Sequence, residues 1–137
     1  MAATKNNMNV VSVAGLIRQL GIAYKTKCTM VVQSKPGCGK TEIITKAGAS
    51  LVPSTGTVWY FNAALKSQEW VGGIMFPAEA NTRCKLLTSD HWGMVQDGDI
   101  VILDEMDKVD HRVQNMYLET SQFKSIDGKK LGATGDV

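Results

Sequence analysis

The spacing of apolar residues along the chain predicts several helices. Within residues 10–24 apolar side chains recur every three or four positions, which places them on one face of a helix. Helices are also expected from residue 41 to about residue 48 and over residues 111–123, where the Asp110 carboxylate can cap the first turn. A shorter helix is expected over residues 63–71, where two glycines follow.

Short runs of β-branched and aromatic residues predict strands over residues 29–33, 57–61 and 99–103. The last run is apolar up to Leu103, which indicates a strand buried on both faces. Residues 74–98 are interrupted by Pro, Gly, Asn and Asp and are expected to be irregular. The dipeptide Asp127-Gly128 predicts a hairpin near the end of the chain. Strands that alternate with helices indicate an α/β fold with a mainly parallel sheet.

A glycine-rich segment, residues 34–41, lies between the first predicted strand and a predicted helix and has the pattern of a phosphate-binding loop. Two glycines let backbone N–H groups curl around an anion at the positive end of the helix dipole. Lys40 would reach the β- and γ-phosphates, and Thr41 would ligate Mg²⁺. The expected nucleotide-binding residues are Ser34, Lys35, Pro36, Gly37, Cys38, Gly39, Lys40, Thr41 and Glu42.

This loop departs from the full pattern at its start, where Ser34 stands in place of glycine. Serine is compatible with the loop if that position does not need a positive φ. The alternative interpretation is a glycine-rich turn between a strand and a helix that binds no ligand.

Two carboxylates, Asp104 and Glu105, directly follow the apolar strand. A buried strand carries such residues to the carboxyl edge of the sheet, where open α/β folds bind ligands. Asp104 would hold Mg²⁺, directly or through water, and Glu105 would deprotonate the water that attacks the γ-phosphate. Taken alone, an apolar strand that ends in two acids is common, so the assignment depends on the phosphate loop.

Composition agrees with one domain, with residues 1–9 as a polar tail and residues 10–137 as the folded part. The formal charge of +2 is too small to indicate nucleic acid or an anionic membrane as partner. The chain has no apolar stretch long enough to span a membrane, and its polar start does not resemble a signal peptide. The three cysteines are odd in number and lack metal-binding spacing, which indicates reduced thiols. A cytoplasmic protein is therefore expected.

The chain resembles the AAA+ ATPases, most closely the MoxR-like and dynein-related group. The residues that carry the resemblance are 36–41, 65–73 and 103–108, with 113–116 and the 126–128 hairpin after them. The resemblance implies a P-loop NTPase three-layer sandwich that uses ATP and Mg²⁺ to remodel a partner protein as a homo-oligomeric ring, usually a hexamer. It also implies that Asn62 joins Lys40 and Glu105 as a catalytic residue and holds the glutamate inactive until a partner binds. The alternative for Asn62 is a polar cap at the end of a strand.

In AAA+ sheets a later strand, which carries a sensor residue, inserts between the phosphate-loop strand and the acidic strand. Here a helix and a hairpin take up most of the sequence after Glu105, so a partial module, apparently truncated before the sensor strand, is expected. Such a module would be of low stability, with weak nucleotide binding and little turnover by itself. The alternative is a compact variant in which the two strands pair directly or the hairpin fills the gap.

Two other functions fit the same motifs. Residues 104–107 also match the acidic D-E-x-D box of helicases and translocases that depend on nucleic acid, although no basic patch with interleaved aromatics accompanies them. A nucleotide-binding chain that hydrolyses little and acts through a partner is the third interpretation. Stimulation of ATP hydrolysis by single-stranded DNA or RNA would favour the helicase interpretation. Nucleotide binding without turnover would favour the third interpretation.

Overall fold

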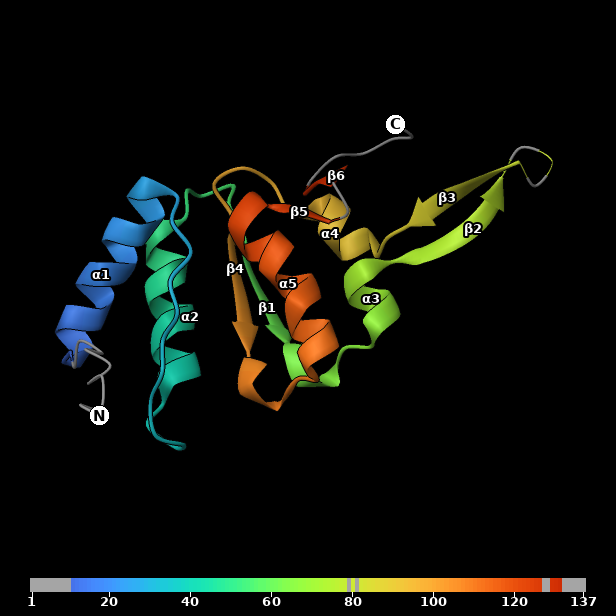
Figure 1. Cartoon of the computed structure of the whole chain (residues 1–137). Coiled ribbons are helices and arrows are strands. Elements are labelled where there is room, and N and C mark those ends of the chain that lie inside the picture. The colour runs from blue at the N-terminus through green and yellow to red at the C-terminus, as the bar shows by residue number, and fades with distance from the viewer. Residues whose placement is uncertain (1–10, 79, 81, 127–128, 132–137) are drawn as a thin grey trace, which may run out of the picture.

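The computed structural model describes residues 11–78, 80, 82–126 and 129–131 as a mixed α/β structure (Figure 1). A parallel pair of strands forms one small sheet, and two antiparallel hairpins form the others. In chain order the elements are α1 (Val13–Thr26), α2 (Lys40–Leu51), β1 (Val58–Asn62), η1 (Ala63–Leu65), α3 (Gln68–Gly72), β2 (Ile74–Ala78), β3 (Arg83–Leu87), α4 (Asp90–Met94), β4 (Ile100–Asp104), η2 (Met106–Lys108), α5 (His111–Phe123), β5 (Ser125–Ile126) and β6 (Lys129–Lys130).

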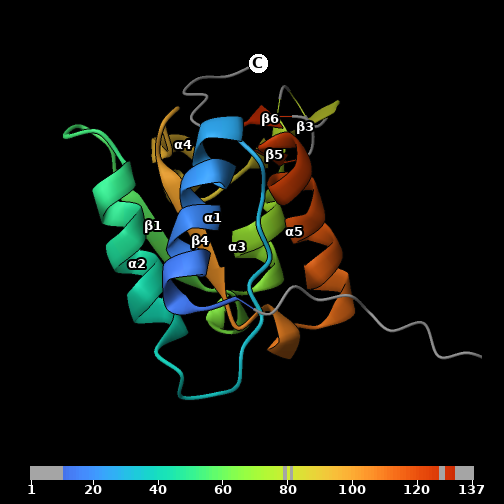
Figure 2. The same ribbon diagram turned by 90° about the vertical axis from the view of Figure 1, so that its left-hand side faces the viewer.

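The parallel sheet consists of β1 and β4, in a register that pairs Val58 with Ile100 and Asn62 with Asp104. It lies between α2 and α5, and α1 packs on α2 (Figures 1 and 2). Because the strands are parallel and in register, Asn62 and Asp104 end at the same edge. The strands predicted over residues 57–61 and 99–103 are therefore confirmed, each with a shift of one residue.

The helix predictions are confirmed for α1, α2 and α5. Asp110 caps α5 as expected, since its Oδ1 accepts a hydrogen bond of 2.8 Å from the Arg112 N–H. The helix expected over residues 63–71 is split into η1 and α3. A new cap explains the split, because the Ser67 hydroxyl accepts a hydrogen bond from the Trp70 N–H and starts α3 there.

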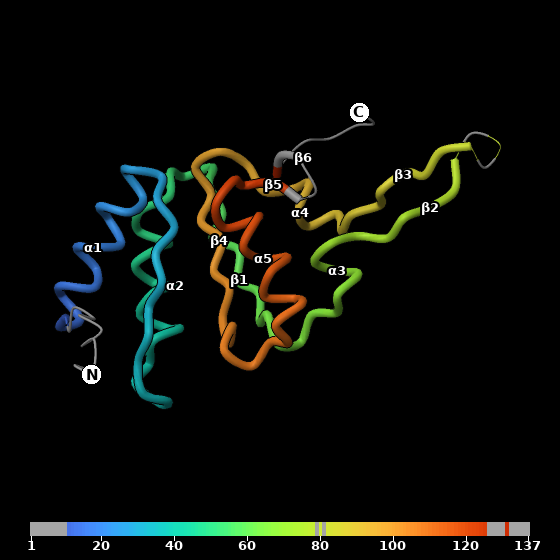
Figure 3. The backbone as a smooth tube through the Cα atoms, viewed as in Figure 1, coloured from blue at the N-terminus to red at the C-terminus, as the bar shows by residue number. Residues whose placement is uncertain are grey.

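The prediction of a strand over residues 29–33 is wrong. This segment runs from the end of α1 to the loop before α2 as irregular chain (Figure 3), and the Val31 side chain is 90% exposed. A strand exists only if its backbone groups pair with a neighbour. Among the described residues, β4 pairs with β1 alone and the β5–β6 hairpin pairs only with itself. Residues 29–33 therefore do not pair with β4, and the β5–β6 hairpin does not lie between them as a strand of the same sheet.

The prediction that residues 74–98 are irregular is also wrong in part. Strands β2 and β3 form an antiparallel hairpin that extends away from the rest of the molecule (Figure 1), and α4 follows. The sequence did not predict β2 because Pro77 lies within it, and proline usually indicates that a segment is not a strand. A strand at the edge of a hairpin tolerates a proline that an interior strand does not. The short hairpin of β5 and β6 is confirmed, while Asp127 and Gly128 lie outside the described residues.

The core lies between the sheet and α5. Its buried residues are Phe61, Ala63, Val71, Trp92 and Tyr117. Trp92 brings α4 into this core, and its indole N–H donates a hydrogen bond of 3.1 Å to the Trp70 carbonyl. This packing holds the ends of β1 and β4, and the polar groups that follow them, in fixed positions.

Candidate functional site

The loop before α2 has the backbone shape that the glycine pattern predicts. Gly37 has a φ of 78° and Gly39 a φ of 70°, both in the left-handed region that only glycine enters at low cost. A Cβ atom at either position would meet nothing within 4 Å, so glycine is needed there for backbone conformation and not for space. Gly39 is also the N-cap of α2 and has no side chain to accept from the first-turn N–H groups. An external anion could accept from those groups.

The other residues expected in the loop are placed around this turn. Ser34, Lys35, Pro36 and Cys38 are exposed, and the Ser34 hydroxyl donates only a local hydrogen bond of 3.3 Å to the Lys35 carbonyl. Glu42 is exposed in the first turn of α2 and forms an ion pair of 2.6 Å with Lys46. The geometry thus gives Glu42 a helix-surface role.

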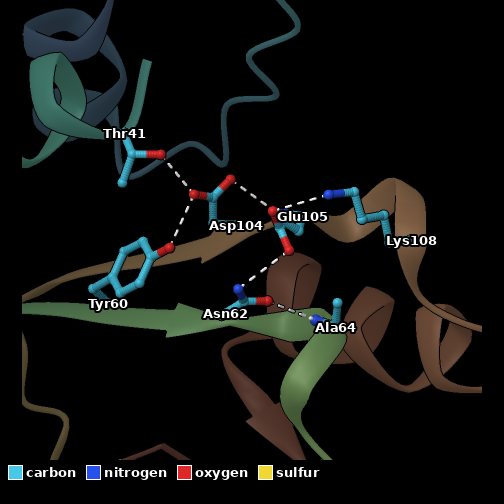
Figure 4. Close-up of polar contacts among 7 residues, drawn as sticks. All are labelled: Thr41, Tyr60, Asn62, Ala64, Asp104, Glu105 and Lys108. Carbon is cyan, nitrogen blue, oxygen red and sulfur yellow. Dashed lines mark hydrogen bonds and ion pairs between the residues drawn. The ribbon is translucent and has the colours of Figure 1, made fainter. Parts of the chain in front are cut away.

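The loop and the acidic strand meet at Asp104. The Thr41 hydroxyl donates a hydrogen bond of 2.6 Å to Asp104 Oδ2, across 63 residues of sequence (Figure 4). The other oxygen, Oδ1, accepts from the Glu105 N–H at 2.8 Å. The hydrogen bond from Thr41 lowers the pKa of Asp104 despite partial burial, and the positive charge of Lys40 acts in the same direction. Asp104 is therefore held as a carboxylate beside Thr41.

Glu105 follows β4 in a left-handed conformation, with a φ of 57° that is uncommon outside glycine. Its two carboxylate oxygens have different partners: Oε1 contacts the Lys108 ammonium at 3.0 Å, and Oε2 accepts from the Asn62 amide at 3.2 Å (Figure 4). The Lys108 hydrogen bond is the main cause of a lowered pKa for Glu105, and that of Asn62 adds to it. In this arrangement Glu105 is ionised and a weaker base than a free glutamate.

Asn62 has both of the contacts that the sequence left as alternatives. Its Oδ1 accepts from the Ala64 N–H at 3.1 Å and caps η1, while its amide nitrogen reaches Glu105. The cap fixes which end of the amide faces the carboxylate. Of the residues predicted for catalysis and metal binding, the structure brings together Thr41, Asn62, Asp104 and Glu105.

Sequence reasoning missed two residues of the site, Tyr60 and Lys108. The Tyr60 hydroxyl donates to Asp104 at 3.0 Å, and Lys108 binds Glu105. Both could have been found by spacing. Tyr60 lies two residues before Asn62 and so on the same face of its strand, and Lys108 lies one helical turn after Glu105.

The donor set suits Mg²⁺, which binds through one or two protein oxygens together with phosphates and water. Thr41 and Asp104 would supply those oxygens. Within the described residues no group of three or more His, Cys, Asp or Glu side chains is placed so that it could hold a metal ion.

No family model, curated protein or solved structure matches this chain. Among the described helices, none has the length and apolar character required to cross a bilayer.

Proposed function

We propose that this chain binds ATP with Mg²⁺ through residues 34–41 and hydrolyses it with Glu105 as general base. The observation that carries the proposal is the hydrogen bond of 2.6 Å between Thr41 and Asp104. It joins a glycine-rich loop of left-handed backbone, at the start of a helix, to a carboxylate at the carboxyl edge of a parallel sheet. That combination is the one that phosphoryl-transfer sites of the P-loop class use.

Binding is assigned to the loop and the first turn of α2. The N–H groups that Gly37 and Gly39 orient would donate hydrogen bonds to the phosphate oxygens, and the Lys40 ammonium would pair with the terminal phosphates. Thr41 and Asp104 would hold Mg²⁺, which neutralises charge on the phosphate oxygens when it is bound. Since Asp104 is ionised and already oriented by Thr41, little rearrangement is needed for this step.

Hydrolysis is assigned to Glu105, which must leave Lys108 or Asn62 to accept a proton from water. Its neighbours make this residue a candidate for control by a partner. We therefore propose that the complete assembly is a ring of copies that remodels a partner protein, as the resemblance to MoxR-like AAA+ ATPases implies. We also propose that the α/β structure is the three-layer sandwich of the P-loop NTPases.

A second candidate function is nucleotide binding without turnover. It is favoured by one specific observation, the double contact of Glu105 with Lys108 and Asn62, because both contacts lower the basicity of the carboxylate. Measured turnover separates the two candidates.

The test is calorimetric titration of the 137-residue chain with ATP and Mg²⁺, together with a phosphate-release assay. Lys40→Ala should weaken binding about 10- to 100-fold, since a hydrogen-bonded charge on phosphate is lost. Glu105→Gln should bind like the parent and hydrolyse about 10²–10⁴-fold more slowly, because the base is removed and the shape is kept. Lys46→Ala is the matched control, a lysine on the surface of the same helix.

Equal affinity of Lys40→Ala and the parent would refute the binding site. A parent that binds ATP but releases no phosphate, alone or with candidate partners, would favour the second candidate. Turnover that rises with single-stranded DNA or RNA would identify a nucleic-acid-dependent ATPase instead.

A further inference from the structure

Asp104 Oδ2 accepts hydrogen bonds from two hydroxyl groups. One comes from Thr41 at 2.6 Å, and the other from Tyr60 at 3.0 Å (Figure 4). A carboxylate oxygen has two lone-pair directions and can accept both hydrogen bonds, while Oδ1, which accepts one, keeps a direction open for a metal. Since Oδ1 is held by the Glu105 N–H, the carboxylate is fixed in rotation about its bond to the β-carbon.

We propose that Tyr60 is a positioning residue of the magnesium–nucleotide site. The inference rests on the function proposed above and adds a residue that no motif of the sequence indicated. Tyr60 holds Asp104 so that Oδ2 faces Thr41 and accepts the hydrogen bond from the Thr41 hydroxyl. The lone pairs of the Thr41 oxygen then stay free, and this oxygen can act as a metal ligand. Tyr60 acts through Asp104 and does not itself bind nucleotide or metal.

The surroundings of Tyr60 separate this role from a role in packing. The side chain is 45% exposed and lies outside the buried core, whereas its strand neighbours Trp59 and Phe61 pack in that core. The strand periodicity explains the difference, because Tyr60 faces the opposite side of the sheet from both. Phenylalanine would therefore keep the packing of the ring and remove only the hydrogen bond.

The experiment measures the affinity for a non-hydrolysable ATP analogue by calorimetry, in Mg²⁺ and in EDTA, for the 137-residue chain and two variants. Mg²⁺ should raise the affinity of Tyr60→Phe for the analogue about tenfold less than it raises that of the parent. This is near the lower end of the loss expected when a residue that orients a metal ligand is removed, because water can replace a half-exposed hydroxyl. Its affinity in EDTA should match the parent. The control is Tyr24→Phe, which also loses one hydroxyl hydrogen bond, of 2.9 Å to the Gly98 carbonyl, and should leave both affinities unchanged.

Three results would overturn the inference. One is a Tyr60→Phe chain with the Mg²⁺ dependence of the parent. Another is an equal loss in EDTA and in Mg²⁺, which would assign Tyr60 to nucleotide contact. The third is a Tyr60→Phe chain that does not fold, which would make the hydroxyl structural. A parent chain that binds no analogue in either condition contradicts the proposed function itself, and so differs from all three.

Discussion

At the scale of single residues, Asp99 fastens the two strands of the parallel sheet together. Its carboxylate accepts hydrogen bonds from the Thr57 N–H and the Trp59 indole, both at 2.8 Å, and from the Gln96 N–H at 2.9 Å. Burial alone raises the pKa of Asp99, but the three hydrogen bonds outweigh it and the pKa is lowered. The ionised form of Asp99 therefore stabilises the fold more than the protonated form does.

Asp99→Asn should lower the free energy of unfolding at pH 7 by about 1–3 kcal/mol, because three hydrogen bonds lose their charged acceptor. Because the folded-state pKa lies below the unfolded value, this stabilisation is present above about pH 4 and is lost as the pH falls through the folded pKa. Urea unfolding at pH 7 and at pH 3 should thus show a smaller difference between parent and variant at pH 3. Asp97→Asn is the control, since its exposed ion pair with Lys27 is worth little. A difference that is equal at both pH values would contradict this account.

At the scale of elements, the junction between α3 and the β2–β3 hairpin depends on one glycine. Gly73 ends α3 with a φ of 82°, and a Cβ atom there would lie 2.7 Å from the Leu87 carbonyl oxygen. The hairpin beyond it exposes Met75 and Phe76 by more than half of their surface. Its attachment therefore depends on the backbone at this junction more than on burial.

Gly73→Ala should destabilise the protein by about 1–3 kcal/mol or more. Alanine is strained at this φ, and its Cβ would overlap a backbone atom that cannot move alone. Gly93→Ala is the matched control: Gly93 lies in α4, its Cβ would meet nothing within 4 Å, and alanine favours a helix by about 1 kcal/mol over glycine. Urea unfolding of both variants measures the difference. Equal stabilities would show that the junction tolerates a side chain.

At the scale of the whole molecule, the segment that leads into the glycine-rich loop before α2 lies outside the parallel sheet. The Lys124 ammonium donates a hydrogen bond of 2.7 Å to the Thr29 hydroxyl, which in turn donates to the Ser121 carbonyl. These contacts tie the segment to the end of α5. Val31 gains little burial from them, since it stays 90% exposed.

Val31→Thr should change the free energy of unfolding by less than about 0.5 kcal/mol, as exposed substitutions do. The same substitution at Val71, which is 1% exposed, should cost about 1–3 kcal/mol because a hydroxyl is buried in the core. Urea unfolding of the two variants gives the comparison. A cost above about 1 kcal/mol for Val31→Thr would place residues 29–33 in a buried strand, as the sequence pattern predicts.

The sequence by itself determined the features that depend on near neighbours. Helical spacing and the Asp110 cap located α5, because these effects act within one or two turns. The glycines of the loop before α2 predicted its left-handed backbone, since a positive φ is a property of single residues. The end of β4 at two carboxylates followed from an apolar run of strand length.

Only the tertiary structure decided which segments pair and which side chains meet. Residues 29–33 have the composition of a strand, but no strand among the described residues pairs with them, and composition does not supply a partner. Tyr60 joins the site because the parallel register brings it to Asp104, 44 residues away in sequence. Contacts between residues far apart in sequence depend on how the elements pack, and no local pattern encodes them.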